Sequence, residues 1–141
     1  MALQVIYSSQ ATTPMSVADL EQILVDAREG NERRGVTGAL VYVEGVFLQI
    51  LEGPEAAVRG LMGSIAKDTR HSALKVVHEA EVDPPMFSTW KMAYLTPTPG
   101  EVAGWLGLQG TASLEQILAE VHQSPSQAPR VAEGILSALA G

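Results

Sequence analysis

Three polar side chains, Tyr7, Asn31 and Gln49, are the first candidates for chemistry in this sequence. Gln49 lies in the middle of the apolar run Val46–Gly53, where a buried amide without hydrogen-bond partners costs roughly 1–3 kcal/mol. Tyr7 ends an earlier β-rich run, and Asn31 lies where a helical pattern meets the next β-rich run. A phenol and two amides that converge suit a planar heterocycle that carries both donors and acceptors.

Each of these residues also has an ordinary structural role. A lone buried glutamine usually bonds to the backbone or to a neighbouring hydroxyl, and a lone tyrosine is usually a core residue. Asn31 alone is typical of a helix C-terminus, while Trp90 and Met92 alone are typical of core packing. Only the combination therefore indicates a binding site.

The composition narrows the kinds of site. A chain of 141 residues and 15.0 kDa is long enough for one domain with a sizeable core. The absence of cysteine excludes disulfides, thiolate metal sites and thiol nucleophiles. The three histidines, His71, His78 and His122, lack the spacing of a helical zinc pair, so we expect no metal site.

The formal net charge of −7 argues against a nucleic-acid-binding surface, which needs clustered lysine and arginine. The basic residues that do cluster suit at most one small anion such as a pyrophosphate: Arg28, Arg33, Arg34, Lys67, Arg70 and His71. The sequence starts without a secretory signal pattern, and no apolar run approaches the roughly 18 residues of a membrane span. We therefore expect a soluble, cytoplasmic protein.

Periodicity predicts the elements that position the candidates. The run 3–9 predicts a first strand, and helical spacing from Ser16 predicts a first helix that ends at Gly30 and Asn31. A second helix opens at Pro54. Four further β-rich runs predict strands: 36–43, 46–52, 73–82 and 89–95.

This order of elements predicts an α+β fold, a ferredoxin-like βαββαβ sandwich. Only Glu44 and Gly45 separate the second and third strands, which indicates a hairpin. Because the first and third strands are neighbours in such a sheet, we expect Tyr7 and Gln49 to meet.

Residues 97–141 predict a C-terminal helical extension, with a capping box at Ser113 and Gln116. We therefore divide the chain into a domain at 1–96 and an extension at 97–141. Both faces of the third strand are apolar, so both are expected to be covered. The two helices of the domain cover one face, and the extension or a second subunit must cover the other.

Five short segments occur in an order and spacing that are specific as a set. They are YSS at 7–9, NERRGVTG at 31–38, GVFLQILEG at 45–53, DTRH at 68–71 and WKM at 90–92. On these segments the sequence resembles the BLUF domains, bacterial sensors of blue light using FAD, over about residues 2–95.

The resemblance implies a non-covalently bound FAD and a role for each matching residue. Tyr7 matches the tyrosine that gives an electron and a proton to the excited flavin, and Gln49 the glutamine between that tyrosine and the ring. Asn31 matches the asparagine that bonds the polar edge of the ring. Positions implied to surround the ring are Ile23, Leu40, Phe47 and Ile65, and those implied to hold the ribityl and phosphate part are Asp68, Arg70 and His71. Trp90 and Met92 match the fifth-strand pair implicated in passing the signal outward.

Three positions depart from the family pattern. Ser8 stands where many members have a basic residue, Ala27 where some have serine, and Ser64 where some have arginine. The photochemical trio is intact, whereas the way in which the phosphates are held is left open.

The expected function is that of a blue-light photoreceptor that stores the signal as a changed hydrogen-bond pattern and is not an enzyme. About 45 residues of helix are too few for an effector domain, so we expect a short stand-alone BLUF protein. A downstream protein partner and at least a homodimer are expected to carry the output. The alternative is an acylphosphatase-like hydrolase with Asn31 and an arginine on phosphate. A purely structural oligomerising domain would leave the polar trio unexplained.

Overall fold

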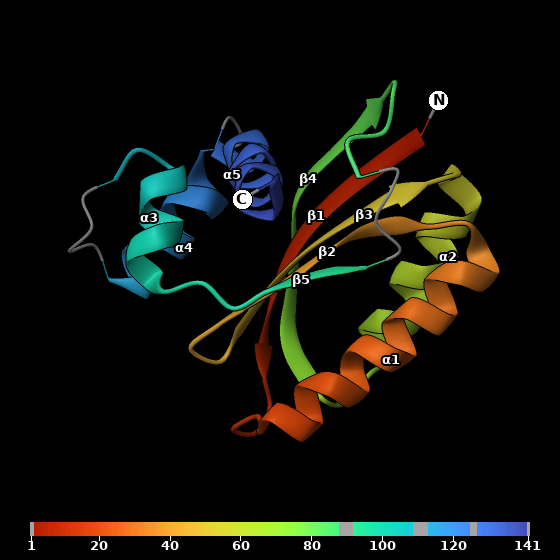
Figure 1. Cartoon of the computed structure of the whole chain (residues 1–141), viewed down its shortest axis with the longest axis horizontal. Helices are drawn as coiled ribbons and strands as arrows, with labels where there is room; N and C mark the ends of the chain where they lie inside the picture. Colours follow the sequence, from red (N-terminus) through yellow and green to blue (C-terminus); the bar gives the residue numbers. More distant parts are fainter. Residues whose placement is uncertain (1, 88–91, 109–112, 125–126, 141) are drawn as a thin grey trace.

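Five strands form one sheet with the order β4-β1-β3-β2-β5 in this computed structural model, which describes residues 2–87, 92–108, 113–124 and 127–140 (Figure 1). The elements of the domain are β1 (Ala2–Ala11), α1 (Val17–Arg34), β2 (Thr37–Val43), β3 (Val46–Gly53), α2 (Glu55–Ala66), β4 (His71–Val82) and β5 (Ala93–Leu95). Three further helices follow, α3 (Pro99–Trp105), α4 (Leu114–Gln123) and α5 (Ala128–Ala140). The ferredoxin-like α+β arrangement predicted from the order of elements is confirmed.

The predicted hairpin between β2 and β3 turns at Glu44 and Gly45. Both residues have a positive φ, 45° and 85°, which is the conformation of the two-residue turn whose twist matches that of the strands. Farther along the hairpin, a Cβ added to Gly38 would lie 1.9 Å from the carbonyl oxygen of Ile50. The absence of a side chain at Gly38 therefore lets β2 approach β3 closely.

Helix α1 ends one turn later than its sequence pattern predicts. Gly30 and Asn31 lie inside the helix, and Gly35 takes the left-handed cap conformation with φ 68°, its N–H donating to the carbonyl of Asn31. The prediction was wrong because the chain offers two glycine stops and the later one has the geometry of a cap. As a result, the buried Asn31 side chain is fixed to a rigid helix and not to a loop.

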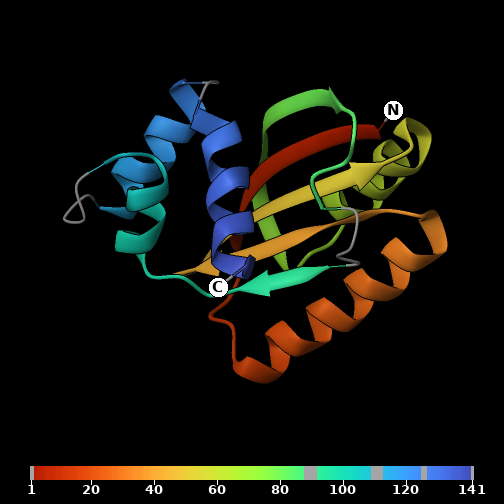
Figure 2. The same cartoon turned by 45° about the horizontal axis from the view of Figure 1, so that its top comes forward.

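The two faces of the sheet pack against different sets of helices. The inner face, as we name it, packs against α1 and α2, and the outer face packs against α3, α4 and α5 (Figures 1 and 2). Ile6, Leu48 and Ile50 are buried on the outer face together with Ile117 of α4 and Ile135 of α5. The extension of the chain itself thus covers the outer face.

Close packing joins the helices of the extension. A Cβ added to Gly134 of α5 would lie 2.3 Å from Cγ of Trp105 at the end of α3, so the indole rests directly on the backbone of α5.

Capping boxes begin two helices of the extension. They are formed by Thr98 with Glu101 at α3 and, as predicted, by Ser113 with Gln116 at α4.

A buried carboxylate ties the segment between β4 and β5 to the outer face. Glu52 of β3 is 0% exposed, and it accepts hydrogen bonds from Nε2 of Gln4 at 2.8 Å and from the N–H groups of Met86 and Phe87 at 3.0 and 2.6 Å. Strand β5 covers Ala93–Leu95 and Met92 precedes it, whereas the first part of the predicted strand, 89–91, lies outside the described residues. Trp90 lies outside the described residues.

Candidate functional site

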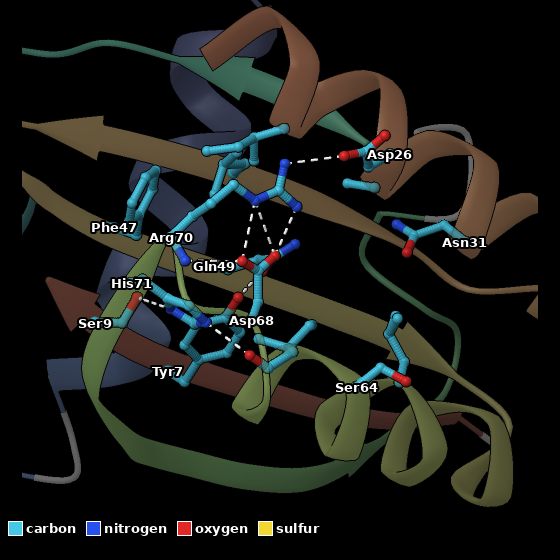
Figure 3. A pocket seen from close by; sticks show the side chains of 15 residues that line it. Tyr7, Ser9, Asp26, Asn31, Phe47, Gln49, Ser64, Asp68, Arg70 and His71 are labelled. Atoms are coloured by element: carbon cyan, nitrogen blue, oxygen red, sulfur yellow. Dashed lines mark hydrogen bonds and ion pairs between the residues drawn. The ribbon is translucent and has the colours of Figure 1, made fainter. Parts of the chain in front are cut away.

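A cavity of about 170 Å³ lies between the inner face of the sheet and helices α1 and α2 (Figure 3). Its lining includes all ten residues predicted to hold a cofactor: Tyr7, Ile23, Asn31, Leu40, Phe47, Gln49, Ile65, Asp68, Arg70 and His71. Ser9, Asp26, Ala27, Leu61 and Ser64 complete the lining. Asp26 and Ser9 were missed, although each lies at the spacing of its own element from predicted residues: three residues after Ile23 on the helix and two after Tyr7 on the strand.

A chain of three side chains crosses the buried wall of the cavity. Tyr7 of β1 and Gln49 of β3 are register partners, and the Tyr7 hydroxyl donates a hydrogen bond to Oε1 of Gln49. Nε2 of Gln49 in turn donates to Sδ of Met92 at 3.6 Å. All three side chains are buried, with exposures of 3%, 5% and 2%. The expected contact between Tyr7 and Gln49 is therefore present, and it continues to the residue that precedes β5.

The environment of Tyr7 keeps its phenol protonated. Burial, and then the negative charge of Asp68, raise the pKa of Tyr7 well above its usual value near 10. The hydroxyl is thus a hydrogen-bond donor to Gln49 at neutral pH and throughout the range in which the protein is ordinarily handled.

An ion-pair network closes one side of the cavity, with Arg70 between Asp26 and Asp68 (Figure 3). Nη1 of Arg70 lies 2.9 Å from Oδ2 of Asp26, and Nη2 lies 2.6 Å from Oδ2 of Asp68. Hydrogen bonds from Arg70 lower the pKa of Asp68, and the same bonds raise the pKa of Arg70. Asp68 and Arg70 are therefore charged at neutral pH, and the network joins α1 to the start of β4.

His71 links β1 to the end of α2 beside this network. Its Nε2 lies 2.7 Å from the carbonyl oxygen of Ile65, which can only accept, so Nε2 carries a proton. In the neutral ring Nδ1 then accepts from the hydroxyl of Ser9 at 2.7 Å. The ring stands edge-on to Phe47 at a centroid distance of 6.4 Å, which fixes the aromatic end of the cavity.

The basic residues grouped in the sequence separate in the structure. Arg70 and His71 line the cavity, but Arg28 of α1 points to β5, where Nε and Nη2 both donate to the carbonyl of Met92 at 3.2 Å. Arg28 therefore binds the backbone of the residue whose side chain contacts Gln49. Ser8 lies on the outer face, because it follows the inward-pointing Tyr7, so its departure from the family pattern does not touch the cavity.

The donor set of the cavity fits a flavin ring. Ile23, Leu40, Phe47, Leu61 and Ile65 provide apolar surfaces for the faces of a planar heterocycle. The amides of Asn31 and Gln49 can bond to carbonyl and ring-nitrogen atoms at its polar edge. Beside the ring site, the guanidinium of Arg70 in the lining offers a positive charge to an anionic tail. Within the described residues no group of three or more metal-ligating side chains occurs.

Comparison with known proteins decides the family. The sequence model of the family described as "Sensors of blue-light using FAD" matches residues 2–93. The chain belongs to the BLUF family. As a BLUF domain it is a blue-light photoreceptor that uses FAD, which confirms the resemblance and is favoured over the acylphosphatase alternative. BLUF domains are sensors and not themselves enzymes.

Relatives and solved structures agree with this assignment. The chain is 41% identical over 91 residues, 64% of its length, to the photoactivated adenylate cyclase subunit beta of Euglena gracilis, of which it spans 11%. The structure described as "BlrB - a BLUF protein, dark state structure" has a TM-score of 0.77 at 23% identity, covering 97% of this chain and 96% of that one. The ground state of BlsA has a TM-score of 0.69 at 28% identity, covering 86% and 88%. The BlrB likeness shows that the fold includes the extension.

Among the described residues, no helix is both long enough and apolar enough to cross a bilayer.

Proposed function

We propose that this BLUF domain stores the light signal in the hydrogen bonds among Tyr7, Gln49 and Met92. Bound FAD supplies the absorption of blue light and, once excited, an acceptor for an electron and a proton. Tyr7 is the donor of both, and Gln49 can interchange its donor and acceptor ends. The observation that carries the proposal is the continuous buried chain from the Tyr7 hydroxyl through the Gln49 amide to the Met92 sulfur.

The geometry indicates what a changed amide would do. In the structure Oε1 of Gln49 faces the Tyr7 hydroxyl and Nε2 faces the Met92 sulfur. Half a turn of the amide would place Nε2 against the phenol oxygen and Oε1 against the sulfur. Two acceptors would then face each other at Met92, so the sulfur would lose its donor and the residue would be pushed from its place. No covalent bond has to break for this state to persist.

Signal output is proposed to pass through Met92 and the extension. Met92 precedes β5, and β5 is a three-residue strand held to β2 by three register pairs, so few residues tie it to the sheet. We propose that Trp90 takes part in transmission as well. The division into a sensor at 1–96 and an extension at 97–141 is supported by the start of α3 at Pro99, immediately after its cap Thr98.

The roles of the remaining cavity residues follow from their positions. Asn31 is proposed to bond the polar edge of the ring, and Ile23, Leu40, Phe47 and Ile65 to contact its faces. Asp68, Arg70 and His71 are proposed to hold the ribityl and phosphate part. This is supported by their place side by side in the lining of the cavity, next to Ser9 and Asp26.

A downstream protein partner in the cytoplasm also remains a proposal. Its support is that the names of relatives join photoactivation to an adenylate cyclase, so in those proteins light acts on an effector. We propose that a protein effector receives the signal here too.

A homodimer is a separate proposal with different support. The apolar outer face that favoured a second subunit is covered by α3, α4 and α5, so it no longer argues for one. The edge strand β4, where Val76 is 40% exposed, offers a surface for pairing. We expect light scattering to give the mass of a dimer, and a monomer in both darkness and light would contradict the proposal.

The test of the proposed function is an absorption spectrum of the purified protein loaded with FAD. We expect a yellow protein whose flavin band moves slightly to the red under blue light and returns in darkness. A swapped hydrogen bond to a flavin carbonyl lowers the transition energy only slightly, so the shift is small. It is fully reversible because no covalent bond has to break. A protein that binds no flavin, or a flavin band that does not move, would refute the assignment.

A further inference from the structure

A polar contact on the outer face joins the photochemical strand to the extension. Oγ of Ser8 in β1 and Nε2 of His122 in α4 lie 2.8 Å apart and share a hydrogen bond across a sequence separation of 114 residues. Ser8 is 4% exposed, and His122 is half-buried between α4 and the sheet. The surrounding contacts of α4 with the sheet are apolar, through residues such as Ile117 and Val121. The hydrogen bond therefore adds a fixed register to an interface that apolar packing alone would leave free to slide.

Ser8 is coupled to the cavity through the backbone, because it is bonded directly to Tyr7. It is the next residue after Tyr7, and its side chain leaves the strand on the opposite face. On the β3 side its register partner is Leu48, the neighbour of Gln49. A displacement of Tyr7 or Gln49 along or across its strand thus moves Ser8 as well.

The strand is irregular at this point. The register between β1 and β4 shifts between Ile6 and Tyr7 and again between Ser8 and Gln10, so irregularities flank the pair Tyr7 and Ser8 on both sides. Such irregularities locally disrupt the ladder and leave residues less tightly paired. The pair can therefore move without breaking a continuous ladder, whereas the regular pairing of β1 with β3 keeps it in contact with Gln49.

The ring of His122 is neutral in this environment. Burial, and then the positive charge of Lys75, hold the pKa of His122 below its usual value near 6.5. Lys75 is the β4 register partner of Ser8, so it lies beside the same contact. A hydrogen bond between a neutral imidazole and a hydroxyl contributes only about 1 kcal/mol, so it can break and form again. Such a bond suits a contact that must change state.

From this arrangement we infer that Ser8 and His122 are positioning residues that pass the state of the Tyr7 strand to helix α4. The inference rests on the proposed function, because it requires a light-driven change at Tyr7 and Gln49. It adds a second route of output, through the outer face and α4, beside the route through Met92 and β5. The departure of Ser8 from the basic residue of other members then has a purpose in this chain.

The test uses the full chain loaded with FAD and measures hydrogen exchange of the α4 amides in darkness and in light. We expect light to change the exchange of α4 several-fold in the unaltered protein. The variants Ser8→Ala and His122→Phe should lose this light–dark difference, and His122→Gln, whose amide can reach the hydroxyl, should restore part of it. Gln123→Ala, an exposed neighbour on the same helix, is the matched control and should keep the full difference.

A second readout separates transmission from simple docking. Because the docked helix favours one arrangement of the strand, Ser8→Ala should also change the dark-recovery time of the red shift several-fold, which a merely structural contact would not do. A light–dark difference at α4 that persists in Ser8→Ala, or that is absent from the unaltered protein, overturns the inference. An unaltered protein without any red shift instead overturns the proposed function, so the two failures can be told apart.

Discussion

Replacing Gln49 with leucine is expected to abolish the light-induced red shift while FAD remains bound. Leucine fills a similar volume among Leu40, Phe47 and Leu51, so the apolar walls of the cavity persist. It offers neither donor nor acceptor to Tyr7 or Met92, so no alternative hydrogen-bond pattern exists to be stored. Tyr7→Phe is expected to have the same effect, because phenylalanine has no hydroxyl to donate. The absorption spectrum before and after blue light measures both.

The matched control for this prediction is Tyr94→Phe. Tyr94 lies on β5 and is half-buried, but it does not line the cavity. Its loss of a hydroxyl should leave the red shift intact. A normal, reversible red shift in either Gln49→Leu or Tyr7→Phe would contradict the mechanism.

The free energy of unfolding of Tyr7→Phe and Gln49→Leu tests the hydrogen bond between these two side chains independently. Each single substitution leaves a buried polar group without its partner, which costs roughly 1–3 kcal/mol. The double variant Tyr7→Phe with Gln49→Leu removes both groups together, so its loss should be smaller than the sum of the two. Denaturant unfolding of the protein without FAD measures this difference.

Replacing Glu52 with leucine is expected to be the most damaging single change outside the cavity. The N–H groups of Met86 and Phe87 would lose their acceptor at once, and Nε2 of Gln4 would keep only the Met86 sulfur at 3.3 Å. At roughly 1–3 kcal/mol for each unpaired donor, the two backbone groups alone should lower the free energy of unfolding by at least about 2 kcal/mol. Typical domains have about 5–15 kcal/mol in all, so this loss would remove a large share of the free energy of unfolding.

Two further variants make the prediction specific. Glu52→Gln keeps one acceptor oxygen and should lose less stability than leucine. Glu55→Leu removes a carboxylate that is exposed and pairs only loosely with Arg59 at 3.8 Å, so it should change stability by less than about 0.5 kcal/mol. Urea midpoints give all three values, and an unchanged midpoint for Glu52→Leu would show that the carboxylate does not hold this segment.

The sequence could predict the cavity because its walls follow simple periods. Tyr7 and Gln49 lie on strands whose side chains alternate, and Ile23 and Asn31 lie on a helix with one face toward the sheet. Asn31 was predicted at the end of the first helix, whereas it lies inside α1, one turn before the helix ends. The packing of α2 against Gly30, with Leu61 4.0 Å from the position of an added Cβ, is a tertiary contact that no local pattern contains.

The polar contacts on the outer face could not be predicted for a different reason. Glu52 reads as the end of a strand, and only the fold shows that two backbone N–H groups from the segment after β4 reach its carboxylate. Ser8 and His122 are separated by more than a hundred residues, so their spacing carries no signal. Likewise, Arg28 belonged to a basic group that suggested phosphate, whereas it binds a carbonyl.

The contact between Trp105 and Gly134 gives the protein an optical probe of its own. Trp90 and Trp105 are the two tryptophans of the chain. In a Trp90→Phe background, fluorescence emission would come from a single indole that rests on the backbone of α5. The signal of that indole reports whether α3 and α5 stay together, so the state of the extension can be followed in time without attaching a dye.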